Sequence, residues 1–253
     1  MGALDKQVAL VTGAGQGVGR GIAIALAKEG AAVAITGKTQ SKLDAVCAEI
    51  KAFGGKAVPI LCNVRDLADI ERTVEDTVKT LGGLDILVNN AYEGYFGKLL
   101  DASDEDFQRG FFSGPIATFR FMKAAYPHLK KRGGGNIVNL ATAAEVRWDM
   151  TTYGPYGAAK AGVRVLTRAA ACEWGPDNIR VNTVAPHANS PALDAWTKNN
   201  PAEAAEFVKT IPAQRIGDCE LDIGRVVAMI VRPEFSYFSG ATVPLDGGQA
   251  RFS

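Results

Sequence analysis

The fold is decided by a glycine-rich stretch near the start of the chain, Thr12-Gly13-Ala14-Gly15-Gln16-Gly17-Val18-Gly19. It follows an apolar run at residues 8–11 and precedes a segment with helical spacing, residues 19–29. Glycines let a pyrophosphate approach the backbone closely, and the N-terminus of a following helix offers free N–H groups to that anion. Because a second apolar run follows at residues 32–35, the pattern predicts a dinucleotide-binding site rather than a plain tight turn.

The same alternation continues along most of the chain. Further short apolar runs lie at residues 57–62, 84–88, 136–140, 179–184 and 242–245. Unbroken apolar strands separated by amphipathic helices are typical of a parallel sheet covered on both faces. The sequence therefore predicts one α/β domain over residues 1–253, with a doubly wound, seven-stranded parallel sheet flanked by helices. Residues 188–215 depart from this rhythm, and we expect them to form a small helical lid over the site.

A long helical pattern in the middle of the chain begins at Ser103, whose side chain is expected to cap the helix together with Asp106. We expect this helix to run to about Arg132. Gly114 and Pro115 lie inside it, and a glycine followed by a proline predicts a distortion or kink there.

Composition narrows the kind of partner. The 253 residues carry 28 Lys and Arg against 27 Asp and Glu, a net charge of +1. This balance argues against nucleic acid or an anionic membrane as the main partner. The cysteines show no metal-ligand spacing, so we predict no metal site and interpret them as reduced, mostly buried thiols: Cys47, Cys62, Cys172 and Cys219. With no secretory or membrane-spanning pattern, we expect a cytoplasmic protein that handles a small molecule.

The end of the second apolar run bears on the choice of cofactor. Sites that prefer NAD place an acidic residue there to hold the ribose 2′-hydroxyl, whereas a basic residue accommodates the 2′-phosphate of NADP. Residues 36–41 contain no acid, and Lys38, Thr39 and Ser41 can all donate to a phosphate. The sequence therefore favours NADP(H) over NAD(H); the alternative is that Lys38 is an ordinary solvated lysine.

Tyr156 and Lys160 lie four residues apart, on one face of a predicted helix at residues 155–174. A phenol has a pKa of about 10 and becomes useful near neutral pH only when a cation stabilises its phenolate. Lys160 can be that cation. Tyr156 then protonates a carbonyl oxygen as a hydride arrives, or deprotonates an alcohol in the reverse direction. Without the glycine-rich turn upstream, a Tyr and a Lys at this spacing would be interpreted as two ordinary surface residues.

In order and spacing these motifs resemble the short-chain dehydrogenase/reductase family over essentially the whole chain. The matching segments are residues 12–19, Asn89-Asn90-Ala91, Tyr156 to Lys160, residues 182–186 and Leu245-Asp246-Gly247-Gly248. The resemblance implies a Rossmann-type oxidoreductase that interconverts a carbonyl and a secondary alcohol, as a homotetramer or homodimer.

The resemblance also assigns cofactor contacts beyond the glycine-rich turn. It implies that Asn63 and Val64 border the adenine, with Asn63 standing where the family usually has Asp. Asn90 and Ala91 would line the cofactor ribose, and Lys160 would also bind the nicotinamide ribose. The matching segment that ends at Pro186 extends the cofactor site to that residue.

The chain departs from the family pattern at several active-site positions. The family's substrate-binding serine aligns with Thr142, which keeps a hydroxyl donor; Thr151, Thr152 and Tyr153 are weaker candidates for this role. Gly114 stands where many members carry an asparagine thought to serve a proton relay.

Tyr92 and His187 stand where glycine is usual, so we expect them to reshape the pocket. His187 is interpreted either as a relay or substrate-binding residue or as a loop histidine packed beside the cofactor.

Aromatic residues lie in the segments expected to surround the substrate: Tyr95, Phe96, Trp148 and Trp196. They favour an apolar or ring-containing substrate, although core or subunit packing explains each equally well. Two other functions remain open. One is a cofactor-binding regulatory or scaffold protein with weak or no catalysis, and the other is a non-redox enzyme on the same scaffold.

Overall fold

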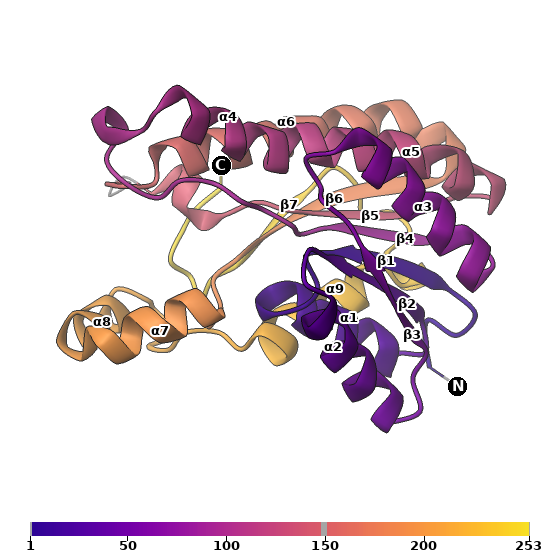
Figure 1. Cartoon of the computed structure of the whole chain (residues 1–253), viewed down its shortest axis with the longest axis horizontal. Helices are drawn as coiled ribbons and strands as arrows, with labels where there is room; N and C mark the ends of the chain where they lie inside the picture. Colours follow the sequence, from indigo (N-terminus) through magenta and orange to yellow (C-terminus); the bar gives the residue numbers. More distant parts are fainter. Residues whose placement is uncertain (1, 148–150, 253) are drawn as a thin grey trace.

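The computed structural model describes residues 2–147 and 151–252, within which seven strands form one parallel sheet (Figure 1). The strands are β1 (Val8–Thr12), β2 (Ala32–Gly37), β3 (Ala57–Leu61), β4 (Ile86–Asn89), β5 (Gly135–Leu140), β6 (Ile179–Pro186) and β7 (Thr242–Leu245). Their order is β3-β2-β1-β4-β5-β6-β7, so the direction of winding reverses between β1 and β4. The predicted doubly wound sheet is confirmed, and such sheets bind ligands where the winding reverses.

Helices cover both faces of the sheet (Figure 1). One layer contains α1 (Gly17–Lys28), α2 (Gln40–Ala52) and α9 (Arg225–Ile230). The other layer contains α3 (Leu67–Leu81), α4 (Asp104–Phe111), α5 (Ala117–Lys131) and α6 (Gly154–Trp174). Because the central strands are covered twice, both of their faces need apolar side chains.

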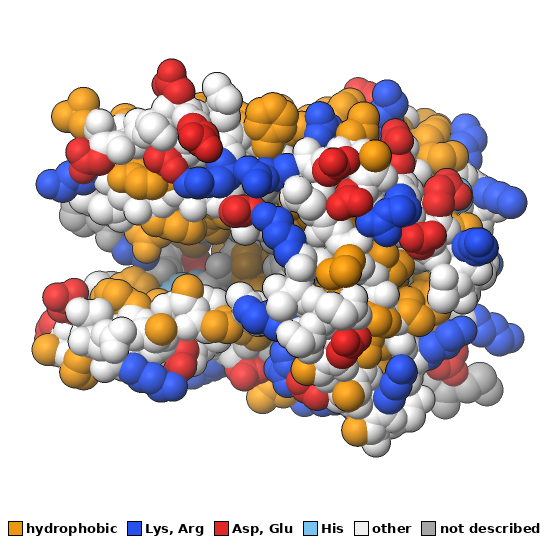
Figure 2. All heavy atoms as spheres, in the orientation of Figure 1, with side chains coloured by type: hydrophobic (Ala, Val, Ile, Leu, Met, Phe, Trp, Pro, Cys, Tyr) orange, Lys and Arg blue, Asp and Glu red, His pale blue; other side chains and the backbone are white. Residues whose placement is uncertain are grey.

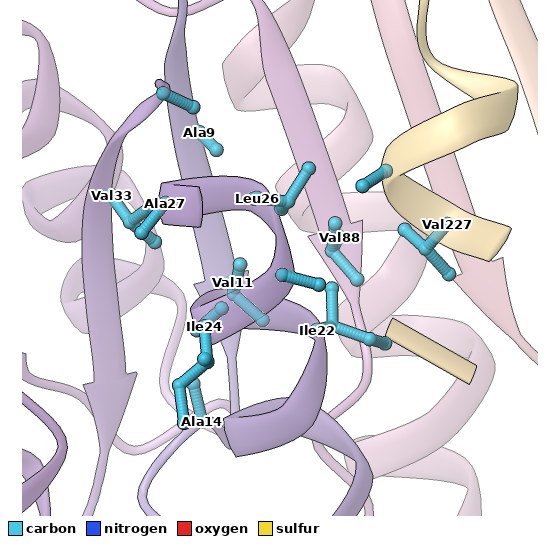
Figure 3. Close-up of a cluster of buried hydrophobic side chains, with 14 of the residues drawn as sticks. Ala9, Val11, Ala14, Ile22, Ile24, Leu26, Ala27, Val33, Val88 and Val227 are labelled. Carbon is cyan, nitrogen blue, oxygen red and sulfur yellow. The ribbon is translucent and has the colours of Figure 1, made fainter. Parts of the chain in front are cut away.

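Strand β1 illustrates this double burial. Ala9 and Val11 pack into the layer of α1, where Figure 3 shows them beside Ile22 and Leu26. Leu10, between them, points to the opposite face and joins the cluster around Phe121. Successive side chains of a strand point to opposite faces, so an unbroken apolar run is what a fully covered strand requires.

The long helix expected from Ser103 to about Arg132 is divided by the predicted kink. Ser103 caps α4 as expected: its side chain accepts from the backbone N of Asp106 at 3.1 Å, and the Asp106 carboxylate accepts in return. At Gly114 the backbone leaves helical geometry, with φ −94° and ψ −106°. Pro115 follows and supplies no N–H, so a wide turn at residues 112–116 separates α4 from α5.

The expected helical lid consists of α7 (Pro191–Asn199) and α8 (Pro201–Lys209), inside residues 188–215. Figure 1 shows these helices as an arm that projects from the body of the molecule. Ser190 caps α7 by accepting from the backbone N of Leu193 at 3.3 Å. Within these two fully described helices, the buried side chain is Ala204. The arm is therefore held by few packing contacts.

The four cysteines differ in exposure. Cys47 and Cys62 are buried free thiols, but Cys219 is half-buried and Cys172 is exposed, so the expectation of buried thiols is wrong for Cys172. No helix in the described ranges is long and apolar enough to cross a membrane. The same ranges hold no cluster of three or more His, Cys, Asp or Glu side chains that could bind a metal ion.

Close packing of α1 against residues 219–224 yields a stability prediction. A Cβ atom added at Gly21 would lie 2.2 Å from the carbonyl oxygen of Cys219. We expect Gly21→Ala to lower the free energy of unfolding by about 1–3 kcal/mol, because the two backbones must separate. Urea denaturation measures this. The matched control is Gly175→Ala, where no atom lies within 4 Å of the new methyl group and stability should not fall; equal stability of the two variants would contradict the close packing.

Candidate active site

A cavity of about 600 Å³ lies at the carboxyl ends of β1, β2, β3 and β4. The structure brings together in its wall most of the residues predicted to bind a dinucleotide. These are Gly13, Gly15, Gln16, Gly17, Val18, Gly19, Lys38, Val64, Asn90 and Ala91. The cavity therefore coincides with the point where the sheet reverses its winding.

The glycine-rich turn needs its glycines for two reasons. Gly13 and Gly17 have positive φ angles of 64° and 56°, which side chains of other residues rarely allow. At Gly19 an added Cβ would lie 2.5 Å from the side-chain nitrogen of Asn90. The turn thus keeps its backbone exposed to the cavity while α1 packs tightly behind it.

A side-chain brace ties this turn to the end of β4. The Thr12 hydroxyl oxygen accepts from the backbone N of Asn90 at 2.9 Å and from that of Ala91 at 3.0 Å. In return, the Asn90 amide donates to the carbonyl oxygens of Thr12 at 2.8 Å and Gly13 at 3.2 Å. Asn90 lines the cavity as expected, and it also uses its amide to shape the turn.

Positive charge gathers where β2 ends. Lys38, Thr39 and Lys42 line the cavity, whereas Ser41 does not. The Nζ atom of Lys42 donates to Oε1 of Gln16 at 2.6 Å. The ammonium of Lys38 forms an ion pair with the carboxylate of Glu93, and this contact lowers the pKa of Glu93.

Glu93 is a residue that could add polar recognition but that the sequence cannot place. It lines the cavity after β4, far from Lys38 in the sequence, and no local pattern connects the two. Lys42, by contrast, lies in the first turn of α2, only four residues after Lys38, and that short distance in the sequence could have identified it.

The predicted catalytic side chains meet at the neighbouring strand end. Thr142 is buried just after β5 and accepts from the backbone N of Ala144 at 3.2 Å, so it caps the short turn at residues 143–146. Its hydroxyl also bonds to the phenol of Tyr156. Burial raises the pKa of Tyr156 to about 12, and the bond from Thr142 opposes that rise. Thr142 therefore both satisfies backbone groups and touches the predicted acid–base residue.

Lys160 lies one turn along α6 from Tyr156 and is almost completely buried. Its Nζ atom donates to the carbonyl oxygen of Leu140 at 2.6 Å. Burial lowers the pKa of Lys160 to about 8, while the carboxylate of Glu145 opposes the fall. The lysine is thus held beside the end of β5, and its pKa lies much closer to neutral pH than that of an exposed lysine.

Aromatic rings surround Tyr156. The ring centroid of Tyr92 lies 5.0 Å away at 63°, that of Phe96 at 4.9 Å and that of Tyr153 at 6.3 Å. Tyr92 lines the cavity and packs against Tyr156. Thr152 is exposed and has a φ of 75°.

Some predicted residues lie elsewhere. Asn63 does not line the cavity; its side-chain oxygen accepts from the backbone N of Arg65 at 3.3 Å, beside a separate hollow. Pro186 ends β6 and pairs with Leu245 of β7, also outside the cavity lining. Both assignments stay predictions.

His187 lines a neighbouring cavity of about 360 Å³, and its ring meets Phe207 of the arm edge-on at 5.3 Å. Burial lowers the pKa of His187. Trp196 packs edge-on against Phe207 at 5.9 Å. Trp148 lies outside the described residues.

The arm contributes to the site in a way that the sequence did not specify. Ser190, Pro191 and Ala192, at the start of α7, line the dinucleotide cavity opposite the glycine-rich turn. Figure 2 shows a deep hollow between the arm and the body of the molecule, with hydrophobic side chains along its margins. Phe96 is 55% exposed, which leaves its ring available to a ligand.

Comparisons with known proteins agree with this geometry. A family model described as enoyl-(acyl carrier protein) reductase matches residues 13–250. The 12alpha-hydroxysteroid dehydrogenase of Clostridium sp. is 38% identical over 259 residues, which cover 99% of each chain. Dehydrogenase/reductase SDR family member 4 of Bos taurus is 34% identical over 246 residues, 97% of this chain and 88% of that protein.

Solved structures give the same result. A dehydrogenase/reductase from Sinorhizobium meliloti 1021 superposes with a TM-score of 0.91 at 33% identity, over 98% of this chain and 96% of that one. A 7 alpha-hydroxysteroid dehydrogenase, in complex with NADH and 7-oxo glycochenodeoxycholic acid, has a TM-score of 0.90 at 30% identity and the same coverage. This chain belongs to the short-chain dehydrogenase/reductase family, whose members are oxidoreductases of alcohols and carbonyls.

Proposed function

We propose that this protein is an NADP(H)-dependent oxidoreductase that interconverts a carbonyl and a secondary alcohol, with Tyr156 as the acid–base residue. The observation that carries the proposal is the contact between the phenol of Tyr156 and the hydroxyl of Thr142, one helical turn from the buried Lys160. These groups do not line the cavity that holds the glycine turn, but Tyr92 does, and its ring packs against Tyr156. One site thus offers both an anion cradle and a proton donor.

The residues present fit a dinucleotide. A Cβ at Gly13 would lie 2.9 Å from the Cα of Ala91, so the cradle depends on glycine. The N-terminus of α1 opens onto the cavity and favours a pyrophosphate there. Lys38 and Lys42 supply positive charge where the adenosine ribose phosphate of NADP would lie. When bound, the nicotinamide supplies or accepts the hydride.

The protein's own groups handle the proton. Tyr156 gives its phenolic proton to the substrate oxygen in reduction and takes a proton from the alcohol in oxidation. Thr142 donates to the phenol oxygen and so stabilises its ionised form. Lys160 adds positive charge nearby while Leu140 fixes the position of its Nζ atom. Thr142 and Lys160 together make a buried phenol able to lose its proton.

The substrate we propose is apolar and contains rings. Phe96 and Tyr153 present partly exposed rings beside Tyr156, and the hollow under the arm has hydrophobic margins (Figure 2). Two of the proteins that this chain resembles are hydroxysteroid dehydrogenases by name. The proposal also places the protein in the cytoplasm as a homotetramer or homodimer.

Replacement of the phenol tests the acid–base role. Tyr156→Phe removes the proton but keeps the ring, so kcat for reduction of a panel of ring-containing ketones should fall by about 10²–10⁴-fold. NADPH binding, followed by fluorescence, should change little. Tyr153→Phe is the matched control and should retain turnover. Substantial activity of Tyr156→Phe would refute the role, and NADPH binding without turnover in the unmodified protein would favour a regulatory function.

Removal of the Thr142 hydroxyl should move the pH dependence of alcohol oxidation. Thr142 donates to the phenolate, so its loss raises the pKa of Tyr156. In Thr142→Val the pH at which oxidation becomes half-maximal should therefore rise, and kcat at neutral pH should fall. Thr142→Ser keeps the donor and should behave like the unmodified protein. An unchanged pH profile in Thr142→Val would separate Thr142 from the chemistry and leave it a capping role.

Cofactor preference tests Lys38. Lys38→Ala should raise KM for NADPH about tenfold or more, since a charge-assisted contact to a phosphate is lost, and should affect KM for NADH much less. Glu93→Gln should lower KM for NADPH by up to about fivefold, because it frees Lys38 from a surface ion pair. A preference for NADH in the unmodified protein, or equal effects on both cofactors, would overturn the choice of NADP(H).

A further inference from the structure

The buried ammonium of Lys160 has an unusual neighbour. Its Nζ atom lies 5.0 Å from the centroid of the Tyr92 ring, over the ring face. An aromatic face attracts a cation, and the attraction strengthens where water is excluded. Lys160 is only 4% exposed and already donates to Leu140. Tyr92 therefore covers a second side of a cation that has little access to water.

Two glycines leave the space that the Tyr92 ring fills. A Cβ atom added at Gly114 would lie 3.5 Å from Cε2 of Tyr92, so a longer side chain there would enter the ring's volume. A Cβ atom at Gly110 would lie 2.9 Å from the Tyr92 hydroxyl oxygen. Gly110 lies near the end of α4 and Gly114 lies at the kink, four residues later. The bulky residue after β4 and the absent side chains on this segment are therefore structurally linked.

The ring of Tyr92, rather than its hydroxyl, makes the contacts that matter. The hydroxyl oxygen is buried without a hydrogen-bond partner in the part of the chain that the structure describes. Burial raises the pKa of Tyr92 to about 12, so this group stays protonated. The same ring makes an edge contact with Tyr156, and Phe96 contacts both of these rings. One ring thus contacts both residues of the acid–base pair.

We propose that Tyr92 is a positioning residue of the active site: its ring face holds Lys160 in the charged form and its edge fixes the phenol of Tyr156. This inference rests on the proposed function only for its effect on turnover. The effect on the charge of Lys160 is a property of the protein itself and can be measured without a reaction.

The other groups around Lys160 define what else affects its charge. Glu145, in the turn after β5, favours the charged form and is itself paired with Arg164 of α6 at 3.2 Å. Tyr156 lies on the same helix, with Tyr153 beside it. Arg109 of α4 lowers the pKa of Tyr92 and is not among the groups that shift the pKa of Lys160. Loss of the aromatic face removes a stabiliser of the cation while Glu145 stays in place, so the pKa of Lys160 should fall.

The test compares Tyr92→Leu, which removes the aromatic face, with Tyr92→Phe, which removes only the hydroxyl. Carbon-13 NMR of the labelled lysine Cε atoms gives the titration of Lys160 in the protein alone, with Lys160→Arg used to assign the signal. In Tyr92→Leu the midpoint should fall by about half a unit to one and a half units of pH. In Tyr92→Phe it should stay within experimental error of the unmodified protein.

Kinetics supply the second readout. Carbonyl reduction that needs charged Lys160 declines as pH rises through the pKa of that lysine. The high-pH limb of the pH–rate profile should therefore shift to lower pH in Tyr92→Leu and stay in place in Tyr92→Phe. Phe96→Leu removes the other ring on Tyr156 and should leave this limb where it is. If Tyr92→Leu fails to fold, as judged by its thermal transition, Tyr92→Met serves instead.

The outcomes separate this inference from the proposed function. Equal shifts in the Phe and Leu variants would assign the effect to the hydroxyl, and no shift in the Leu variant would show that the ring does not stabilise the cation; either overturns the inference. An absence of turnover in the unmodified protein would overturn the proposed function, and the NMR titration would still decide the role of Tyr92.

Discussion

The tie between Thr12 and Asn90 extends the pairing of β1 with β4 past the strand ends, at the point where the winding of the sheet reverses. A hydroxyl and an amide join the turn after β1 to the end of β4. The adjoining residue Asn89 continues the connection, donating to Asn139 of β5 at 2.8 Å, and Asn139 donates to Thr167 of α6 at 2.9 Å. A buried polar chain therefore runs from the cofactor turn to the helix that carries Tyr156. Networks of this kind fix one arrangement, because a broken member leaves buried polar groups unpaired.

Burial disfavours the charged forms of the proposed catalytic pair, Tyr156 and Lys160. It raises the pKa of Tyr156 and lowers that of Lys160, so a dry pocket alone would favour a neutral phenol beside a neutral amine. Thr142 opposes the shift of Tyr156 and Glu145 opposes that of Lys160, both from the end of β5, although Glu145 also adds to the rise at Tyr156; Tyr92 lies over the lysine from the end of β4. The charge states of the two groups are thus set by neighbours from two separate segments and not only by the spacing of two residues on one helix.

Interactions between residues close together in the sequence could be predicted, and interactions between distant segments could not. The glycine turn, the Ser103 cap, the kink at Gly114 and the pairing of Tyr156 with Lys160 depend on residues a few positions apart, and all could be predicted. Contacts between distant segments could not: Glu93 opposite Lys38 and Tyr92 over Lys160 come together only when β4 is placed beside its neighbours. The cofactor contact predicted for Asn63 from its motif position stays a prediction, and the structure adds a local contact that the motif did not indicate, from the backbone N of Arg65 to its side-chain oxygen.

The sparse packing of the α7–α8 arm has a thermodynamic consequence. A segment that buries so little apolar surface lies at the low end of local stability, so it opens at small cost without global unfolding. Any ligand that draws the arm down must restrict its backbone and side chains, and that loss of conformational entropy is subtracted from the free energy of the contacts made. Affinity at this site will therefore be weaker than the contact area suggests.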